Sequence, residues 1–208
     1  MKRRVVVLDY GSGNIHSVHR ALQRVGADVT VATDPAEGVD ADGLVVPGVG
    51  AYTHCVNQLD AIEGRGVVTD RVAAGRPVLG ICVGLQILFD AGREHGILTK
   101  GLGLLPGEVT RLLAPRVPHM GWNTVTWQPG DPLFAGIDEG ARCYFVHSYA
   151  ARPSRPLRES GARIATSVHG EVFVAAVSSG ALSATQFHPE KSGDVGAVLL
   201  ANWVSGLC

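Results

Sequence analysis

A cysteine between glycines is the feature of this sequence that points most clearly to chemistry. Cys82 stands in the run GICVG at residues 80–84, directly after an apolar segment. This is the layout of a nucleophile elbow, a sharp turn between a strand and a helix. N–H groups at the start of the helix favour a thiolate, and the N–H of Val83 could bind a developing oxyanion. The alternative is a buried structural thiol, as isolated cysteines usually are. We expect that state for the three other cysteines, Cys55, Cys143 and Cys208.

A cysteine nucleophile needs a general base, and the base needs a group that orients it. His188 ends an apolar segment that begins at residue 182, and Pro189 and Glu190 follow it. Residues two apart in an extended segment project to the same side. The Glu190 carboxylate could therefore hold the Nδ1–H of His188 while Nε2 faces the thiol. The alternative is a surface histidine beside a solvated carboxylate.

Two glycine-rich loops follow other predicted strands. The loop PGVG at residues 47–50 could bring the backbone of Val49 and Gly50 beside the elbow as a second oxyanion donor. Taken alone, it is more often an ordinary strand–helix turn. Residues 11–13, GSG, suggest a dinucleotide loop, but the third glycine of that fingerprint is replaced by His16. We therefore expect residues 11–13 to shape a surface.

The first hundred residues predict alternating strands and helices, which must position these groups. Short β-branched runs alternate with segments of helical spacing, and glycines separate them. Strands that are apolar throughout are typical of a parallel sheet buried on both faces. The predicted strands cover residues 5–8, 29–32, 44–46 and 77–81. The predicted helices cover residues 15–25, part of 52–62, and 67–74.

The second half changes character after about residue 101, where strands follow one another more closely. We expect an antiparallel or mixed section added to the parallel sheet, an exposed loop at residues 152–156 and a last helix from about residue 193. The predicted strands cover residues 108–112, 123–127, 142–149, 164–168, 172–178 and 182–186. The fold class is therefore α/β, with a mostly parallel central sheet and flanking helices in three layers.

The composition excludes several classes of protein. The chain has 208 residues and a formal net charge of −1, whereas nucleic-acid binders usually carry a basic patch. Its apolar runs are too short for a membrane span or a signal peptide. The four cysteines form no CxxC pair, which argues against a zinc site or a disulfide scaffold. We expect one cytoplasmic domain over residues 1–208 that binds neither nucleic acid nor membranes.

The elbow GICVGLQ at residues 80–86 and the motif FHPE at 187–190 resemble the class I, or triad, glutamine amidotransferases. Val83 and Leu85 stand where leucine and methionine are more usual in that family. Five further segments resemble a branch whose members supply ammonia to a separate (β/α)8 cyclase that makes imidazole glycerol phosphate in histidine biosynthesis. These segments are DYGSGN (9–14), PGVG (47–50), PHMGWN (118–123), YFVHSY (144–149) and HPEKSG (188–193).

The resemblance implies hydrolysis of L-glutamine to glutamate and ammonia by Cys82, His188 and Glu190, with no metal or organic cofactor. It implies that the backbone of Val49, Gly50 and Val83 holds the oxyanion. It also implies that the substrate is bound by Gln86, Ser148 and Tyr149. The half-reaction is that of a hydrolase, and the assembled synthase would act as a lyase.

A 208-residue glutaminase leaves no room for the chemistry that consumes ammonia, so the resemblance implies a heterodimer with the cyclase. The residues expected at or near that interface are Asn14, Trp122, Tyr144 and Lys191. The loop at residues 47–50 could form its oxyanion donor only when the partner holds its ligand.

Three alternatives remain open at this stage. The chain could serve pyridoxal phosphate synthase or another ammonia consumer, although MGWN at residues 120–123 and Lys191 argue against it. It could be a binding module that keeps the fold without catalysis, although the intact triad argues against that. It could be a cysteine peptidase on a related fold, which would cleave peptides and not glutamine.

Overall fold

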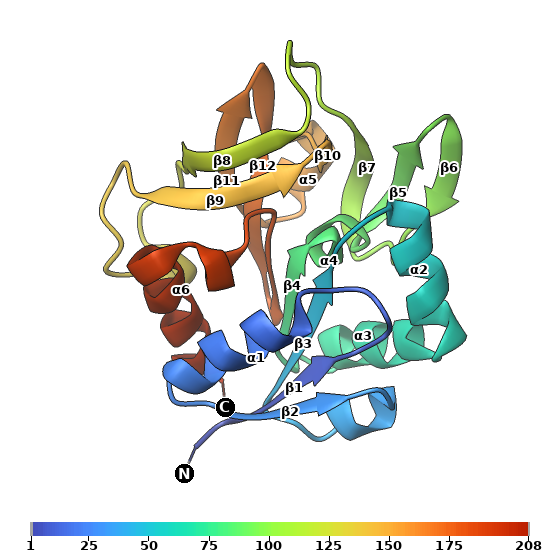
Figure 1. Cartoon of the computed structure of the whole chain (residues 1–208), viewed down its shortest axis with the longest axis vertical. Helices are drawn as coiled ribbons and strands as arrows, with labels where there is room; N and C mark the ends of the chain where they lie inside the picture. The colour runs from blue at the N-terminus through green and yellow to red at the C-terminus, as the bar shows by residue number, and fades with distance from the viewer. Residues whose placement is uncertain (1, 208) are drawn as a thin grey trace.

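A seven-stranded sheet organises the chain, of which this computed structural model describes residues 2–207 (Figure 1). Its strands are β1 (Arg4–Leu8), β2 (Asp28–Ala32), β3 (Gly43–Gly48), β4 (Val78–Cys82), β11 (Arg163–His169), β12 (Glu171–Ser179) and β13 (Leu182–Thr185). They lie in the order β11-β12-β13-β4-β3-β1-β2. The strands from β13 to β2 are parallel, and β12 and β11 continue the sheet antiparallel. The predicted α/β fold with a mostly parallel central sheet is confirmed.

Burial along the strands follows their place in the sheet. β3 and β4 are buried at every residue, as their unbroken apolar runs predict. β2 differs, because Asp28, Thr30 and Val31 are exposed. The expectation that residues 29–32 are buried on both faces is therefore wrong. The reason is that β2 is the edge strand and has β1 as its one neighbour in this sheet.

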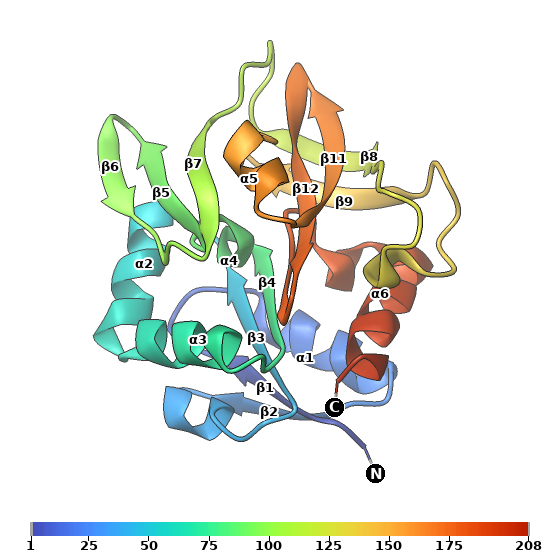
Figure 2. The same cartoon turned by 180° about the vertical axis from the view of Figure 1, so that it is seen from behind.

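Helices cover both faces of the central sheet (Figures 1 and 2). α1 (Ile15–Arg24) and α6 (Gly193–Ser205) lie on one face, and α2 (Tyr52–Ala61) and α3 (Gly64–Ala73) lie on the other. Helix α3 begins three residues before the predicted helix 67–74. The short helix α4 (Val83–Gln86) follows β4 without a loop. This arrangement gives the three predicted layers.

The remaining strands within residues 2–207 form two separate sheets, and those over residues 89–94 and 97–100 were not predicted from the sequence. A four-stranded sheet has the order β10-β7-β5-β6, and β8 pairs with β9 in a two-stranded ribbon. The bounds are β5 (Phe89–Glu94), β6 (Ile97–Lys100), β7 (Leu105–Arg111), β8 (His119–Thr124), β9 (Arg142–His147) and β10 (Tyr149–Ala151). The predicted strand 142–149 is thus divided at Ser148, and its two parts join different sheets. Hydrophobic patterning predicts a strand but does not choose its partner.

The predicted loop at residues 152–156 is partly wrong, because helix α5 (Arg155–Glu159) begins inside it. Ser154 caps that helix by accepting a hydrogen bond from the N–H of Leu157, and Pro156 occupies the first turn. Three 3₁₀ turns complete the secondary structure, at Pro35–Gly38, Pro132–Phe134 and Pro189–Lys191. None of the helices within residues 2–207 is long and apolar enough to cross a membrane.

Candidate active site

Cys82 lies on a strained turn between β4 and α4. Its φ of 57° and ψ of −110° are rare for a residue with a side chain, and such strain persists where the surroundings enforce it. A Cβ at Gly84 would overlap the carbonyl oxygen of Val46, and a Cβ at Gly80 would lie 2.8 Å from the oxygen of Gly84. The two glycines are therefore required for the close packing of the turn against β3. The structure places the GICVG motif at a strand–helix elbow, as the sequence predicts.

His188 and Glu190 meet as a buried pair beside that turn. The Nδ1 of His188 lies 2.8 Å from Oε1 of Glu190, and both side chains are almost fully buried. Within residues 2–207, the Nε2 of His188 has no hydrogen-bond partner. Burial lowers the pKa of His188, but Cys82 and Glu190 outweigh this effect and raise that pKa to about 10. The imidazole is thus held as a cation next to Glu190 and the sulfur of Cys82.

The turn that carries His188 is fixed from several sides. The N–H of His188 donates to Tyr144 O at 2.9 Å, and Ser192 Oγ donates to His188 O at 2.7 Å. A Cβ at Gly196 of helix α6 would overlap the carbonyl oxygen of Pro189, so this helix packs directly on the turn. The Nδ2 of Asn14 lies 3.3 Å from Oε1 of Glu190. Asn14, expected from the sequence at the partner interface, therefore also contacts the carboxylate of this pair.

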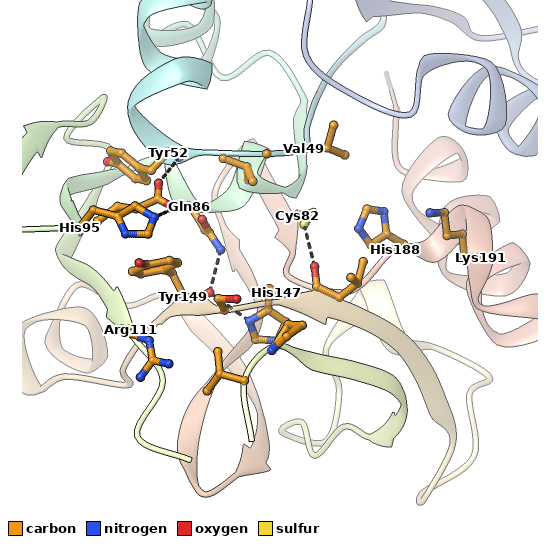
Figure 3. A pocket seen from close by; sticks show the side chains of 17 residues that line it. Val49, Tyr52, Cys82, Gln86, His95, Arg111, His147, Tyr149, His188 and Lys191 are labelled. Atoms are coloured by element: carbon orange, nitrogen blue, oxygen red, sulfur yellow. Dashed lines mark hydrogen bonds and ion pairs between the residues drawn. The ribbon is translucent and has the colours of Figure 1, made fainter. Parts of the chain in front are cut away.

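A cavity of about 520 Å³ opens in front of Cys82 and His188 (Figure 3). Gln86, Ser148 and Tyr149, which the resemblance predicts to bind the substrate, line it. Glu94 and Arg111 line it as well, and sequence reasoning missed both. They end the strands β5 and β7, which the sequence pattern did not place beside the elbow. The volume suits a small ligand, and the two opposite charges suit one that is itself charged.

The two backbone segments expected to bind an oxyanion differ in orientation. The N–H of Val83 opens helix α4 and so has no acceptor within that helix. The N–H of Val49 instead donates to Ser12 Oγ at 3.3 Å, while Val49 O accepts from Ser12 Oγ at 2.7 Å and from Cys55 Sγ at 3.3 Å. In this structure Val49 is thus directed toward Ser12. The thiol of Cys55 is buried, as expected, and also takes part in this hydrogen bonding.

Among the residues expected at a partner interface, Lys191 lines the cavity, and Trp122 and Tyr144 lie on the β8–β9 ribbon. Trp122 and Tyr144 face each other across the β8–β9 ribbon, with ring centroids 6.0 Å apart. Trp122 is 48% exposed, and the neighbouring Met120 is 64% exposed. Lys191 is exposed and also lines the cavity. Cys143 is buried, as predicted, while Cys208 lies outside the described residues. Over residues 2–207 no three His, Cys, Asp or Glu side chains gather in a way that could hold a metal ion.

Comparisons with known proteins agree with this geometry. The family model "Glutamine amidotransferase class-I" matches residues 6–205. The chain is 58% identical over 203 residues to imidazole glycerol phosphate synthase subunit HisH of Mycobacterium tuberculosis, covering 98% of each chain. It is 55% identical over 211 residues to the HisH subunit of Thermobifida fusca, covering 100% of each.

Solved structures agree on the fold. The PurLQS structure from Thermotoga maritima superposes with a TM-score of 0.73 at 19% identity, covering 100% of each chain. That identity supports the fold alone, whereas the family match and the HisH relatives span nearly the whole chain. The chain therefore belongs to the class I glutamine amidotransferases and, within them, to the HisH family of imidazole glycerol phosphate synthase subunits.

Proposed function

We propose that Cys82, His188 and Glu190 are the catalytic triad of an L-glutamine hydrolase. The observation that carries this is the strained cysteine beside a buried histidine whose Nδ1 binds Glu190 at 2.8 Å. The thiolate adds to the amide carbon of glutamine, and His188 gives its proton to the leaving nitrogen, so that ammonia departs and a thioester remains. Water then adds to the thioester while His188 takes its proton. The carbon–sulfur bond breaks, which releases glutamate and restores the thiolate.

The cavity supplies the contacts that a free amino acid needs. Gln86, Ser148 and Tyr149 lie along its wall and are proposed to bind glutamine. Arg111 lies at the end of the cavity away from His188 (Figure 3). We propose that Arg111 and Glu94 attract the α-carboxylate and the α-ammonium of the substrate. Opposite charges at this end would favour glutamine with both groups free over a glutamine residue inside a peptide.

The oxyanion of the tetrahedral intermediate needs two donors, and the N–H of Val83 at the start of α4 is proposed as the first. The second is proposed to come from the Val49–Gly50 segment after a peptide unit has turned away from Ser12. Gly50 has a φ of +89°, and Val49 is 38% exposed, so the segment has room to turn. We propose that the partner, when it holds its own ligand, favours the turned state.

The partner is proposed to be a (β/α)8 cyclase that consumes the ammonia, in a heterodimer with this chain. The HisH relatives are subunits of imidazole glycerol phosphate synthase, which supports a partner chain. Trp122 and Met120, which are exposed on strand β8, suit a protein interface. The proposed interface residues are Asn14, Trp122, Tyr144 and Lys191. Residues 1–208 would act as one domain, in the cytoplasm, where the free cysteines Cys55, Cys82 and Cys143 stay reduced.

The test is glutamate release from L-glutamine by the pure chain, alone and with the cyclase and its nucleotide ligand. Strong stimulation by the partner, absent in Cys82→Ala, is the expected result. Turnover that ignores this cyclase would assign the glutaminase to another synthase. Covalent labelling of Cys82 by a glutamine-analogue electrophile separates a glutaminase from a binding module. Peptide cleavage without glutamate release would identify a peptidase and overturn the proposal.

A further inference from the structure

We infer that Gln186 is a further catalytic residue, whose side-chain amide donates a hydrogen bond to the sulfur of Cys82 and stabilises the thiolate. This inference rests on the proposed function, in which Cys82 is the nucleophile. The Nε2 of Gln186 lies 3.8 Å from Cys82 Sγ, within the range of a hydrogen bond to sulfur. Gln186 is fully buried, so water cannot replace this acceptor.

The sheet register brings the two residues together. Thr185 of β13 pairs with Ile81 of β4 in parallel. The residues that follow them, Gln186 and Cys82, therefore lie side by side. The N–H of Gln186 donates to Ala175 O at 2.8 Å, which fixes its backbone to β12. Gln186 is thus placed by the same strands that place the nucleophile, and not by a mobile loop.

The orientation of the Gln186 amide follows from its neighbours. The Nε2 of Gln86 lies 2.8 Å from Tyr149 O, a backbone carbonyl that can only accept, so this atom of Gln86 must be the nitrogen. Its second N–H points to Oε1 of Gln186 at 3.0 Å, which must be the accepting oxygen. The remaining atom of the Gln186 amide is then the nitrogen, and it faces the sulfur.

The carbonyl oxygen of Tyr149 also accepts the last of a series of hydrogen bonds that runs through Asn123, His119 and His147. His147 Nδ1 donates to Tyr149 O at 3.0 Å, so its Nε2 accepts from His119 Nδ1 at 3.0 Å. The Nε2 of His119 then accepts from Asn123 Nδ2 at 3.1 Å. Burial lowers the pKa of His119 to about 4 and that of His147 to about 3, which keeps both rings neutral, as these donor and acceptor roles require. These hydrogen bonds fix the orientation of Tyr149 O and, through it, the orientation of the side-chain amides of Gln86 and Gln186.

The chemical consequence concerns the charge on sulfur. A buried amide N–H is poorly satisfied by a neutral thiol, which is a weak acceptor, and well satisfied by a thiolate. His188 supplies the cation beside the sulfur, and Gln186 supplies a neutral donor from β13. A neutral donor remains in place after His188 has given its proton to the leaving nitrogen. It can therefore stabilise the thiolate that leaves when the thioester is hydrolysed.

The experiment measures the rate of Cys82 alkylation by iodoacetamide against pH, because the thiolate is the reacting form. Two variants are compared with the wild type. Gln186→Met removes the amide, and Gln186→Glu keeps an oxygen for Gln86 but removes the N–H donor. Cys82→Ala gives the background from the other three cysteines, Cys55, Cys143 and Cys208. Thr185→Val is the matched control: it loses a buried hydroxyl that donates to Phe187 O at 2.9 Å, one residue away from Gln186.

Both Gln186 variants should shift the midpoint of the alkylation profile upward by about one pH unit, the size expected for a hydrogen bond to a charged group. Their kcat for glutamine should fall about tenfold, and Thr185→Val should keep the wild-type midpoint. Lower activity with an unchanged midpoint in Gln186→Met, whose fold is checked by circular dichroism, would overturn the inference. Failure of the proposed function would look different, because the wild type itself would then release no glutamate.

Discussion

The turn that carries Cys82 and the Val49–Gly50 segment lie close together, yet the structure fixes them to very different degrees. At the turn, added methyl groups on Gly80 or Gly84 would meet backbone atoms, so neither position has room for a side chain. At the loop, a Cβ on Gly50 would meet nothing within 4 Å, and Val49 is held by hydrogen bonds to Ser12 and Cys55. The proposed nucleophile is thus fixed by steric exclusion, whereas the proposed second oxyanion donor is held by hydrogen bonds that can be exchanged.

The largest effect is expected where the turn is most crowded. Gly84→Ala should lower the free energy of unfolding by about 3 kcal/mol or more, because the new methyl group overlaps the backbone carbonyl of Val46, which cannot move aside alone. Urea unfolding measures the loss. Gly66→Ala in helix α3 is the control, since its Cβ meets nothing within 4 Å and alanine favours the helix by about 0.5–1 kcal/mol. Equal effects of the two substitutions would refute the steric account of the turn.

The next largest effect is expected from acid, which should lower the free energy of unfolding through His147, a residue that lines the cavity. Burial lowers the pKa of His147 to about 3, while the unfolded chain binds this proton as the pH falls through about 6.5. The contribution of neutral His147 to the free energy of unfolding is present above pH 6.5 and is lost as the pH falls toward 3. Between pH 7 and pH 5, His147 should account for a loss of about 2 kcal/mol. Urea unfolding of the wild type and of His147→Gln at both pH values checks this, and parallel losses would contradict it.

A smaller effect is expected at the loop, where a substitution should increase glutamate release. Ser12→Ala removes the acceptor of the Val49 N–H, so the turned peptide should become more accessible without the partner. One hydrogen bond is worth about 1 kcal/mol, which corresponds to a rise of about fivefold in partner-independent glutamate release. Ser12→Thr keeps the hydroxyl and should retain the wild-type rate. A slower Ser12→Ala enzyme would mean that the loop needs this contact to work.

The smallest effect is expected at the surface, away from both regions. Arg155 and Glu159 form an i,i+4 ion pair at 2.6 Å on helix α5, with side chains 87% and 61% exposed. Such pairs contribute at most about 0.5 kcal/mol. Arg155→Ala should therefore leave the thermal midpoint and glutamate release nearly unchanged. A loss comparable to that of Gly84→Ala would show that the contrast between crowded and open sites does not govern stability here.

Sequence reasoning reached the parallel sheet and the proposed triad because both depend on local signals. Apolar runs predict buried strands, and the motifs around Cys82 and His188 are contiguous in the chain. It did not reach Glu94, Arg111 or Gln186, because their roles come from strand partners chosen in three dimensions. Gln186 carries a partial signal, since a glutamine in an apolar segment must be satisfied by some buried partner. The separate sheets of β5–β10 gave no such signal, because periodicity does not specify pairing.

The pairing of β4 with β13 has a consequence for how the protein is made. Cys82 and Gln186 are 104 residues apart, and the turn at His188 is packed against the last helix, α6. During synthesis the proposed nucleophile therefore leaves the ribosome long before His188 and β13 exist. We expect glutamine hydrolysis to begin only once the residues up to helix α6 have been made and have folded.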